Sequence, residues 1–149
     1  MTLNRRSIQK AGWYGLLSGI FLAIFFKVIE QSTHLKVYTL LLNVDYIPII
    51  NRYHFPEMIE VAFHLVISIL LSITLAFALH IQHVTLRKNA ILWCTIACLL
   101  IGLLLFPTTA FSNRTPSITS IPSLLYWLAG HALYGFMLGC LFARERESN

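Results

Sequence analysis

Four apolar runs dominate the chain, and each is long enough to cross a lipid bilayer, which takes about 20 mostly apolar residues in a helix. The runs cover residues 12–29, 58–79, 90–106 and 121–142. Because 57% of the 149 residues are hydrophobic and only 11% are charged, one soluble core of this length could not hide the apolar surface. The sequence therefore predicts an all-α, polytopic membrane protein. It forms a single domain, residues 1–149, in which four transmembrane helices make one bundle.

Basic residues at the ends of the runs predict the orientation of the bundle. With the N-terminus inside, the cytoplasmic segments carry seven of the 11 lysines and arginines: Arg5, Arg6, Lys10, Arg87, Lys88, Arg144 and Arg146. The positive-inside rule then favours both termini in the cytoplasm, an N-in/C-in topology. No small-residue cleavage site follows the first run, so we expect this helix to be retained. The net charge of +5 is spread over helix ends rather than gathered on a face, which does not favour nucleic acid as a partner.

Glycines recur at helical spacing in the first and last runs. Gly12, Gly15 and Gly19 lie in the first run, and Gly135 and Gly139 lie in the fourth. Because small residues let two helices approach closely in lipid, we expect these two helices to be neighbours. The same rows would also serve a homo-oligomer or an unidentified membrane-protein partner.

Ionisable residues inside the runs are the strongest indication of a special site. Glu57, Glu60 and His64 share one face of the second helix, and the same stripe continues through Ser68 and Ser72. Ionisable groups in a bilayer cost about 2.5–3.5 kcal/mol each on insertion scales, so they are usually paired or functional.

Other helices extend this cluster. Lys27 and Glu30 lie near the outer end of the first helix, and His131 lies in the middle of the fourth. The candidate cluster thus contains Lys27, Glu30, Glu57, Glu60, His64 and His131, all in the outer half of the membrane in the predicted topology.

Three interpretations of the cluster remain open. In the first it is structural, with Lys27 compensating a carboxylate and the histidines hydrogen-bonded to Glu60 or to hydroxyls. In the second it is proton-responsive or belongs to a small proton-coupled transporter subunit, with a role in acid or envelope stress. In the third it holds a metal in a membrane enzyme, although no H-E-x-x-H or comparable spacing occurs. We predict a non-enzymatic protein without cofactor or metal, because phosphate-loop and nucleophile-elbow motifs are also missing from the sequence.

The remaining segments carry weaker signals. The outside loop, residues 31–55, is long and apolar, so we expect it to lie as an interfacial helix or to cap the mouth of the bundle. Phe106-Pro107 is expected to interrupt the end of the third helix. Cys94, Cys98 and Cys140 are interpreted as buried reduced thiols.

Several short motifs occur in a familiar order: Gly15-x-x-x-Gly19, Lys27 with Glu30, Phe63-His64-Leu65-Val66-Ile67-Ser68, Leu105-Phe106-Pro107 and Gly130-His131. In this order the chain resembles the YagU-like family of small bacterial inner-membrane proteins. The resemblance implies a multi-pass protein of the bacterial plasma (inner) membrane, in a family without an established biochemical activity. It maps the family's lysine, glutamate and histidines onto Lys27, Glu30, His64 and His131. The chain departs from the family in the first outside loop, where Leu35-Lys36-Val37-Tyr38 replaces an expected Pro-Pro-Arg segment.

Overall fold

The computed structural model describes residues 5–44, 55–82, 84 and 86–147, without the side chains of residues 146 and 147. Its elements are α1 (Arg5–Thr33), α2 (Val37–Leu42), α3 (Glu57–Ile81), α4 (Arg87–Leu105), the 3-10 helix η2 (Phe106–Phe111) and α5 (Ile121–Glu147). The described residues contain no strand. The four long helices, with η2 extending the third, are each long and apolar enough to cross a membrane, as predicted. They fit a multi-pass integral membrane protein.

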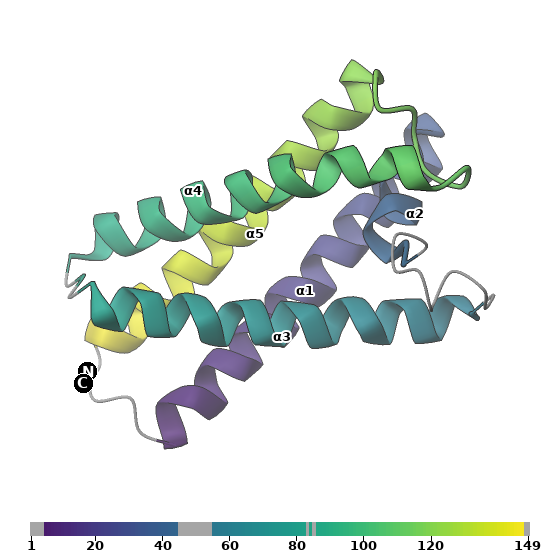
Figure 1. Cartoon of the computed structure of the whole chain (residues 1–149). Coiled ribbons are helices and arrows are strands. Elements are labelled where there is room, and N and C mark those ends of the chain that lie inside the picture. Colours follow the sequence, from purple (N-terminus) through teal and green to yellow (C-terminus); the bar gives the residue numbers. More distant parts are fainter. Residues whose placement is uncertain (1–4, 45–54, 83, 85, 148–149) are drawn as a thin grey trace.

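The four long helices form two closely packed pairs. One pair is α1 with α3, the other is α4 with α5, and contacts between α1 and α5 join the pairs. By contrast, α3 and α4 touch at only a few positions and diverge toward the end of the bundle where α2 lies (Figure 1). At the opposite end the start of α1 meets the end of α5, where Lys10 Nζ lies 3.1 Å from Glu145 Oε1.

A regular ladder of hydrogen bonds holds α3 against α1. Every fourth residue of α3 donates to a backbone carbonyl of every fourth residue of α1: Ser72 Oγ to Ala11 O at 2.6 Å, Ser68 Oγ to Gly15 O at 2.7 Å, and His64 Nε2 to Gly19 O at 3.1 Å. The polar stripe predicted on this helix therefore faces α1. Gly15 and Gly19 make the approach possible, because a Cβ atom at Gly15 would lie 2.7 Å from Ser68 O.

The first and last long helices are neighbours, as predicted, but their glycine rows do not face each other. Gly135 and Gly139 of α5 pack on α4, where a Cβ atom at Gly135 would lie 2.5 Å from Cys94 O. Gly12 makes no close approach, since its Cβ would lie 3.7 Å from Ile69 Cγ2. Small residues permit a close contact, but the opposing helix decides which contact forms. On α4 that surface is a buried row of small residues: Ala90, Cys94, Cys98 and Gly102.

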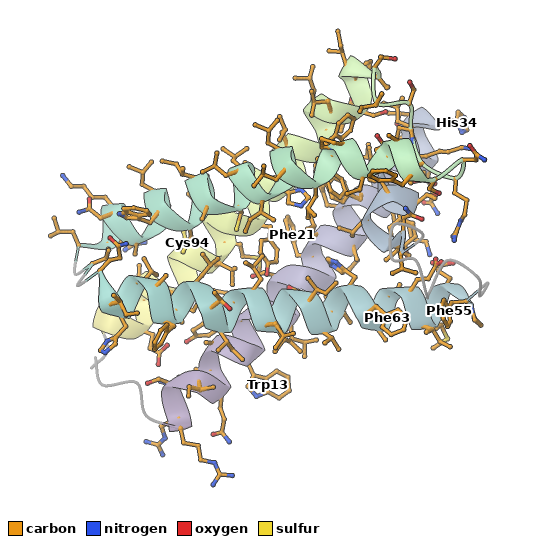
Figure 2. All side chains as sticks on the ribbon, in the orientation of Figure 1. Trp13, Phe21, His34, Phe55, Phe63 and Cys94 are labelled. Carbon is orange, nitrogen blue, oxygen red and sulfur yellow. The ribbon has the colours of Figure 1, made fainter. Side chains whose placement is uncertain are left out.

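The outward faces of the helices carry large apolar side chains. Trp13 is 64% exposed and projects away from the helices (Figure 2), and Leu104 is 76% exposed. Such faces fit a lipid environment rather than water.

The segment before α3 and the end of α4 also match their predicted roles. In the first outside loop, α2 buries Val37, Leu40 and Leu42 against the bundle and so caps it. Other residues of that loop, 45–54, lie outside the described residues. Helix α4 ends at Leu105, and Pro107 stands in the first turn of η2.

Candidate functional site

A cavity of about 170 Å³ lies in the half of the bundle near α2. Side chains from α1, α2, α3, α4, η2 and α5 line it, and most of them are apolar. Polar side chains gather on the walls formed by α3 and α5, where His64, Ser68, His131 and Tyr134 contribute to the lining. The cavity therefore combines an apolar volume with a polar wall, as binding sites for small molecules usually do.

His131 is held in place by its neighbours on α4 and α5. It is 6% exposed, and its Nδ1 lies 2.9 Å from Trp127 O. The Trp127 indole donates from Nε1 to Gly102 O at 2.8 Å. Gly102 also leaves room for the imidazole, because a Cβ at that position would lie 2.7 Å from His131 Cγ. One glycine of α4 thus positions both rings.

Tyr134 connects the two helical pairs inside the cavity wall. Its hydroxyl oxygen lies 2.8 Å from Ser68 Oγ and 3.1 Å from Ser68 O. Because the Ser68 hydroxyl donates to Gly15 O, the proton between Tyr134 and Ser68 comes from the tyrosine. Helix α5 is thereby linked to the ladder between α1 and α3.

Glu60 is the buried carboxylate of the site, and its partner is Arg114 in the segment between η2 and α5. The guanidinium makes two bonds, from Nη1 to Oε1 at 2.9 Å and from Nη2 to Oε2 at 3.2 Å. The Glu60 side chain is 5% exposed, whereas that of Arg114 is 43% exposed. Such a two-bond arrangement satisfies a carboxylate that would otherwise be costly to bury. Sequence reasoning missed Arg114 as a site residue and treated it only as an outside cation.

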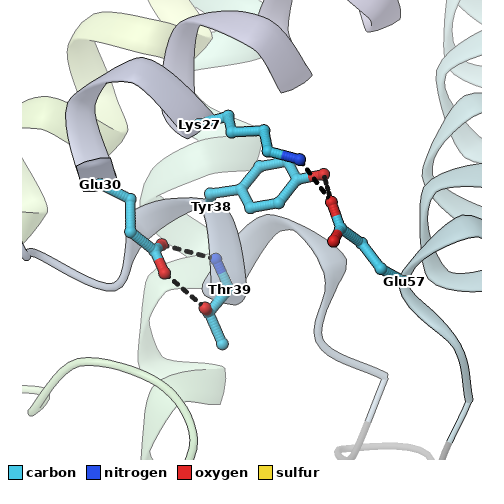
Figure 3. A network of polar contacts seen from close by, with 5 residues as sticks. All are labelled: Lys27, Glu30, Tyr38, Thr39 and Glu57. Atoms are coloured by element: carbon cyan, nitrogen blue, oxygen red, sulfur yellow. Dashed lines mark hydrogen bonds and ion pairs between the residues drawn. The ribbon is translucent and has the colours of Figure 1, made fainter.

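A polar cleft of about 390 Å³ lies beside the cavity, and Glu60 lines both. In it Lys27 Nζ lies 2.7 Å from Glu57 Oε1, and Tyr38 OH donates to the same oxygen at 2.8 Å (Figure 3). Lys27 Nζ is also 5.2 Å from the centre of the Tyr38 ring. Burial, and then the hydrogen bond to Glu57, raise the pKa of Tyr38 above its ordinary value, so its hydroxyl stays protonated as a donor.

Glu30 joins the cleft to α2. Its carboxylate accepts from the Thr39 backbone N–H at 2.8 Å and from Thr39 Oγ1 at 2.7 Å (Figure 3). Thr39 lies in the first turn of α2, where backbone N–H groups lack partners within the helix. Glu30 therefore fixes the cap over the cavity.

The six residues of the predicted cluster divide into two groups. Lys27, Glu30 and Glu57 line the cleft, His64 and His131 line the cavity, and Glu60 lines both. The expectation that the histidines bond to Glu60 or to hydroxyls is wrong for the described residues, because both donate to backbone carbonyls instead. The reason is local. Gly19 exposes its carbonyl to α3, and His131 reaches back one helical turn.

Three observations describe the chemical groups that the site offers. Within the part of the chain that the structure describes, no three His, Cys, Asp or Glu residues are grouped to hold a metal ion. Cys94 and Cys98 are buried free thiols, and Cys140 is half-buried. Ser68 lines the cavity together with the histidines. Its hydroxyl donates a hydrogen bond to Gly15 O, so it is not arranged as an activated nucleophile.

Comparison of the chain with protein-family models, with curated proteins and with solved structures finds no match.

Proposed function

We propose that this protein binds a small amphiphilic molecule taken from the bilayer and performs no chemistry on it. The proposal includes the placement in a bacterial inner membrane and the membership of the YagU-like family that the sequence resemblance implies. The observation that carries the binding function is the cavity of about 170 Å³ with an apolar mouth and a polar wall.

The mouth of the cavity lies between α3 and α4. Phe63 and Ile67 of α3 and Leu105 of α4 line the cavity and are 36%, 52% and 39% exposed. Because α3 and α4 contact each other at only a few positions, an apolar molecule in the lipid has lateral access between them.

The size of the cavity limits what enters it. An engineered apolar cavity of about 150 Å³ binds benzene. A cavity of about 170 Å³ therefore suits one ring or a short alkyl segment, while the rest of an amphiphile remains between the helices.

Tryptophan fluorescence tests the proposal in the full chain. Trp127 lines the cavity and is 3% exposed, whereas Trp13 and Trp93 are 64% and 51% exposed. In a Trp13→Phe, Trp93→Phe background, bromobenzene in micelles is expected to quench Trp127 saturably, because bromine quenches tryptophan at short range. Excess unbrominated benzene is expected to reverse the quenching by competition.

A matched pair of variants on α4 controls for probe dissolved in the micelle. Ile101 lines the cavity, and Ile96 is 44% exposed to the surroundings. Ile101→Phe is expected to weaken bromobenzene binding by roughly tenfold or more by filling the cavity, while Ile96→Phe leaves it unchanged. Quenching that does not saturate, or that benzene does not reverse, would reject the binding function.

A small proton-coupled transporter subunit is the second candidate. The observation that favours it is the position of Glu60, which lines both the polar cleft and the inner cavity and so stands between water and the histidines. The competition between benzene and bromobenzene can be measured between about pH 5 and 8, the range in which histidine usually titrates. A competition that depends on pH in this range would favour this candidate over simple binding.

A further inference from the structure

Four donor groups of the cavity wall are already used within the protein. On α3, η2 and α5, three of them donate to backbone carbonyls: Ser68 Oγ to Gly15 O, Thr108 Oγ1 to Leu105 O, and Trp127 Nε1 to Gly102 O. The Tyr134 hydroxyl donates to Ser68. These four side chains leave no proton for a ligand that needs a hydrogen-bond donor.

The hydrogen bond of His131 fixes which of its nitrogens carries the proton. Its Nδ1 lies 2.9 Å from Trp127 O, and a carbonyl oxygen only accepts, so Nδ1 is the protonated nitrogen. In the neutral ring Nε2 is then a bare acceptor. Within the described residues Nε2 has no hydrogen-bond partner, although the side chain is more than nine-tenths buried and lines the cavity.

His64 also keeps one acceptor nitrogen, but it does so in the opposite tautomer. Its Nε2 donates to Gly19 O at 3.1 Å, so in the neutral ring Nδ1 keeps the lone pair. This nitrogen too has no partner among the residues described, and the side chain lines the cavity from α3. Two imidazoles from different helices, each with one acceptor nitrogen, thus line the same small volume.

We propose that the cavity selects the ring hydroxyl of a lipophilic phenol, the class that includes hydroquinols, through the free nitrogens of His64 and His131. This inference rests on the proposed binding function. A hydroxyl supplies the donor that these two nitrogens lack, and a single ring fits about 170 Å³. A neutral donor is favoured over an ammonium group, because the Glu60 carboxylate at the edge is already paired with Arg114.

Two probes that differ only in the substituent on the ring oxygen test the class of ligand. In the Trp13→Phe, Trp93→Phe background, 4-hexylphenol and 4-hexylanisole are made to compete with bromobenzene for the Trp127 site. The methyl ether has no proton to donate. We expect the phenol to bind roughly three- to tenfold tighter, the range that one net hydrogen bond provides.

A pair of variants on α5 assigns the preference to the histidine. His131→Phe is expected to remove the preference for the phenol while 4-hexylanisole still binds. Tyr126→Phe, which removes a hydroxyl on a side chain that does not line the cavity, is expected to keep it.

The outcomes separate the two proposals. Equal binding of the two probes to the chain with both histidines would overturn the phenol inference and leave the binding function standing. Failure of both probes to displace bromobenzene that itself binds also overturns the phenol inference. Failure of bromobenzene to bind rejects the binding function on which the inference rests. A preference that persists in His131→Phe would contradict the role given to that histidine. If His131→Phe does not fold, the comparison of probes in the chain with both histidines decides alone.

Discussion

At the scale of single residues, two ion pairs between a glutamate and a basic side chain lie in different surroundings. Glu60 is 5% exposed and pairs with Arg114, whereas Glu57 is 56% exposed and pairs with Lys27. Removing the partner of a buried charge leaves that charge uncompensated, which costs about 3–5 kcal/mol when both groups are buried. Exposed pairs contribute only about 0–1 kcal/mol.

The two pairs therefore predict unequal effects of removing the cation. Because Arg114 is itself 43% exposed and water screens it, we expect Arg114→Gln to lower the free energy of unfolding by about 1–3 kcal/mol. Lys27→Gln is expected to lower it by less than about 1 kcal/mol. Unfolding by denaturing detergent in mixed micelles measures both. The double variant Glu60→Gln, Arg114→Gln should regain part of the loss, since no buried charge is left alone. Equal losses in the two single variants would contradict this explanation.

The sequence predicted which residues of α3 face inward better than it predicted the partners of the site residues. The helical period placed Glu60, His64 and Ser68 on one inward face, because that face follows from spacing alone. Arg114 lies 54 residues from Glu60, and no local pattern relates the two. The acceptors of the histidine protons are backbone carbonyls of Gly19 and Trp127, which a search for side-chain partners could not find.

At the scale of helices, the contact between α1 and α3 depends on glycines at particular positions. A Cβ at Gly15 would lie 2.7 Å from Ser68 O and 2.9 Å from Ile69 Cα, both backbone atoms that do not move without shifting α3. A Cβ at Gly12, one turn earlier, would make only an ordinary contact at 3.7 Å. The two glycines thus form a matched pair for substitution.

We expect Gly15→Ala to separate the helices and to lower the free energy of unfolding by about 1–3 kcal/mol, the usual cost of overpacking. Gly12→Ala is expected to change it by no more than about 0.5 kcal/mol. The same mixed-micelle unfolding measurement applies to both. A loss in Gly12→Ala as large as that in Gly15→Ala would show that the close approach is not the cause.

The existence of the helices was predictable, but their pairing was not. Length and hydropathy identify the four spans, and α1 simply extends beyond its apolar run to include Arg5 and Lys10. Which glycine row faces which helix depends on the opposing surface. The Ser68 and Ser72 hydroxyls bind α3 to backbone carbonyls of α1, and the small residues of α4 let α5 pack closely against it. Spacing within one helix carries no information about that choice.

At the scale of the whole molecule, the two ends of the bundle differ in charge. The start of α1, the start of α4 and the end of α5 lie at one end (Figure 1) and carry the seven basic residues that the sequence analysis assigns to the cytoplasm. The α2 end carries the cavity and the polar cleft. If the basic end is cytoplasmic, the mouth of the cavity opens in the outer half of the membrane, where an amphiphile of the outer leaflet would reach it.

Cysteine labelling in intact cells tests this orientation, which follows from the positive-inside rule. In a Cys94→Ala, Cys98→Ala, Cys140→Ala background, single cysteines replace two exposed lysines at opposite ends, Lys36 before α2 and Lys88 in the first turn of α4. A membrane-impermeant maleimide is expected to label Lys36→Cys in intact cells and Lys88→Cys only after the membrane is permeabilised. The reverse pattern would place the cavity in the cytoplasmic half. Labelling of both positions in intact cells would contradict a helix that crosses the membrane between them.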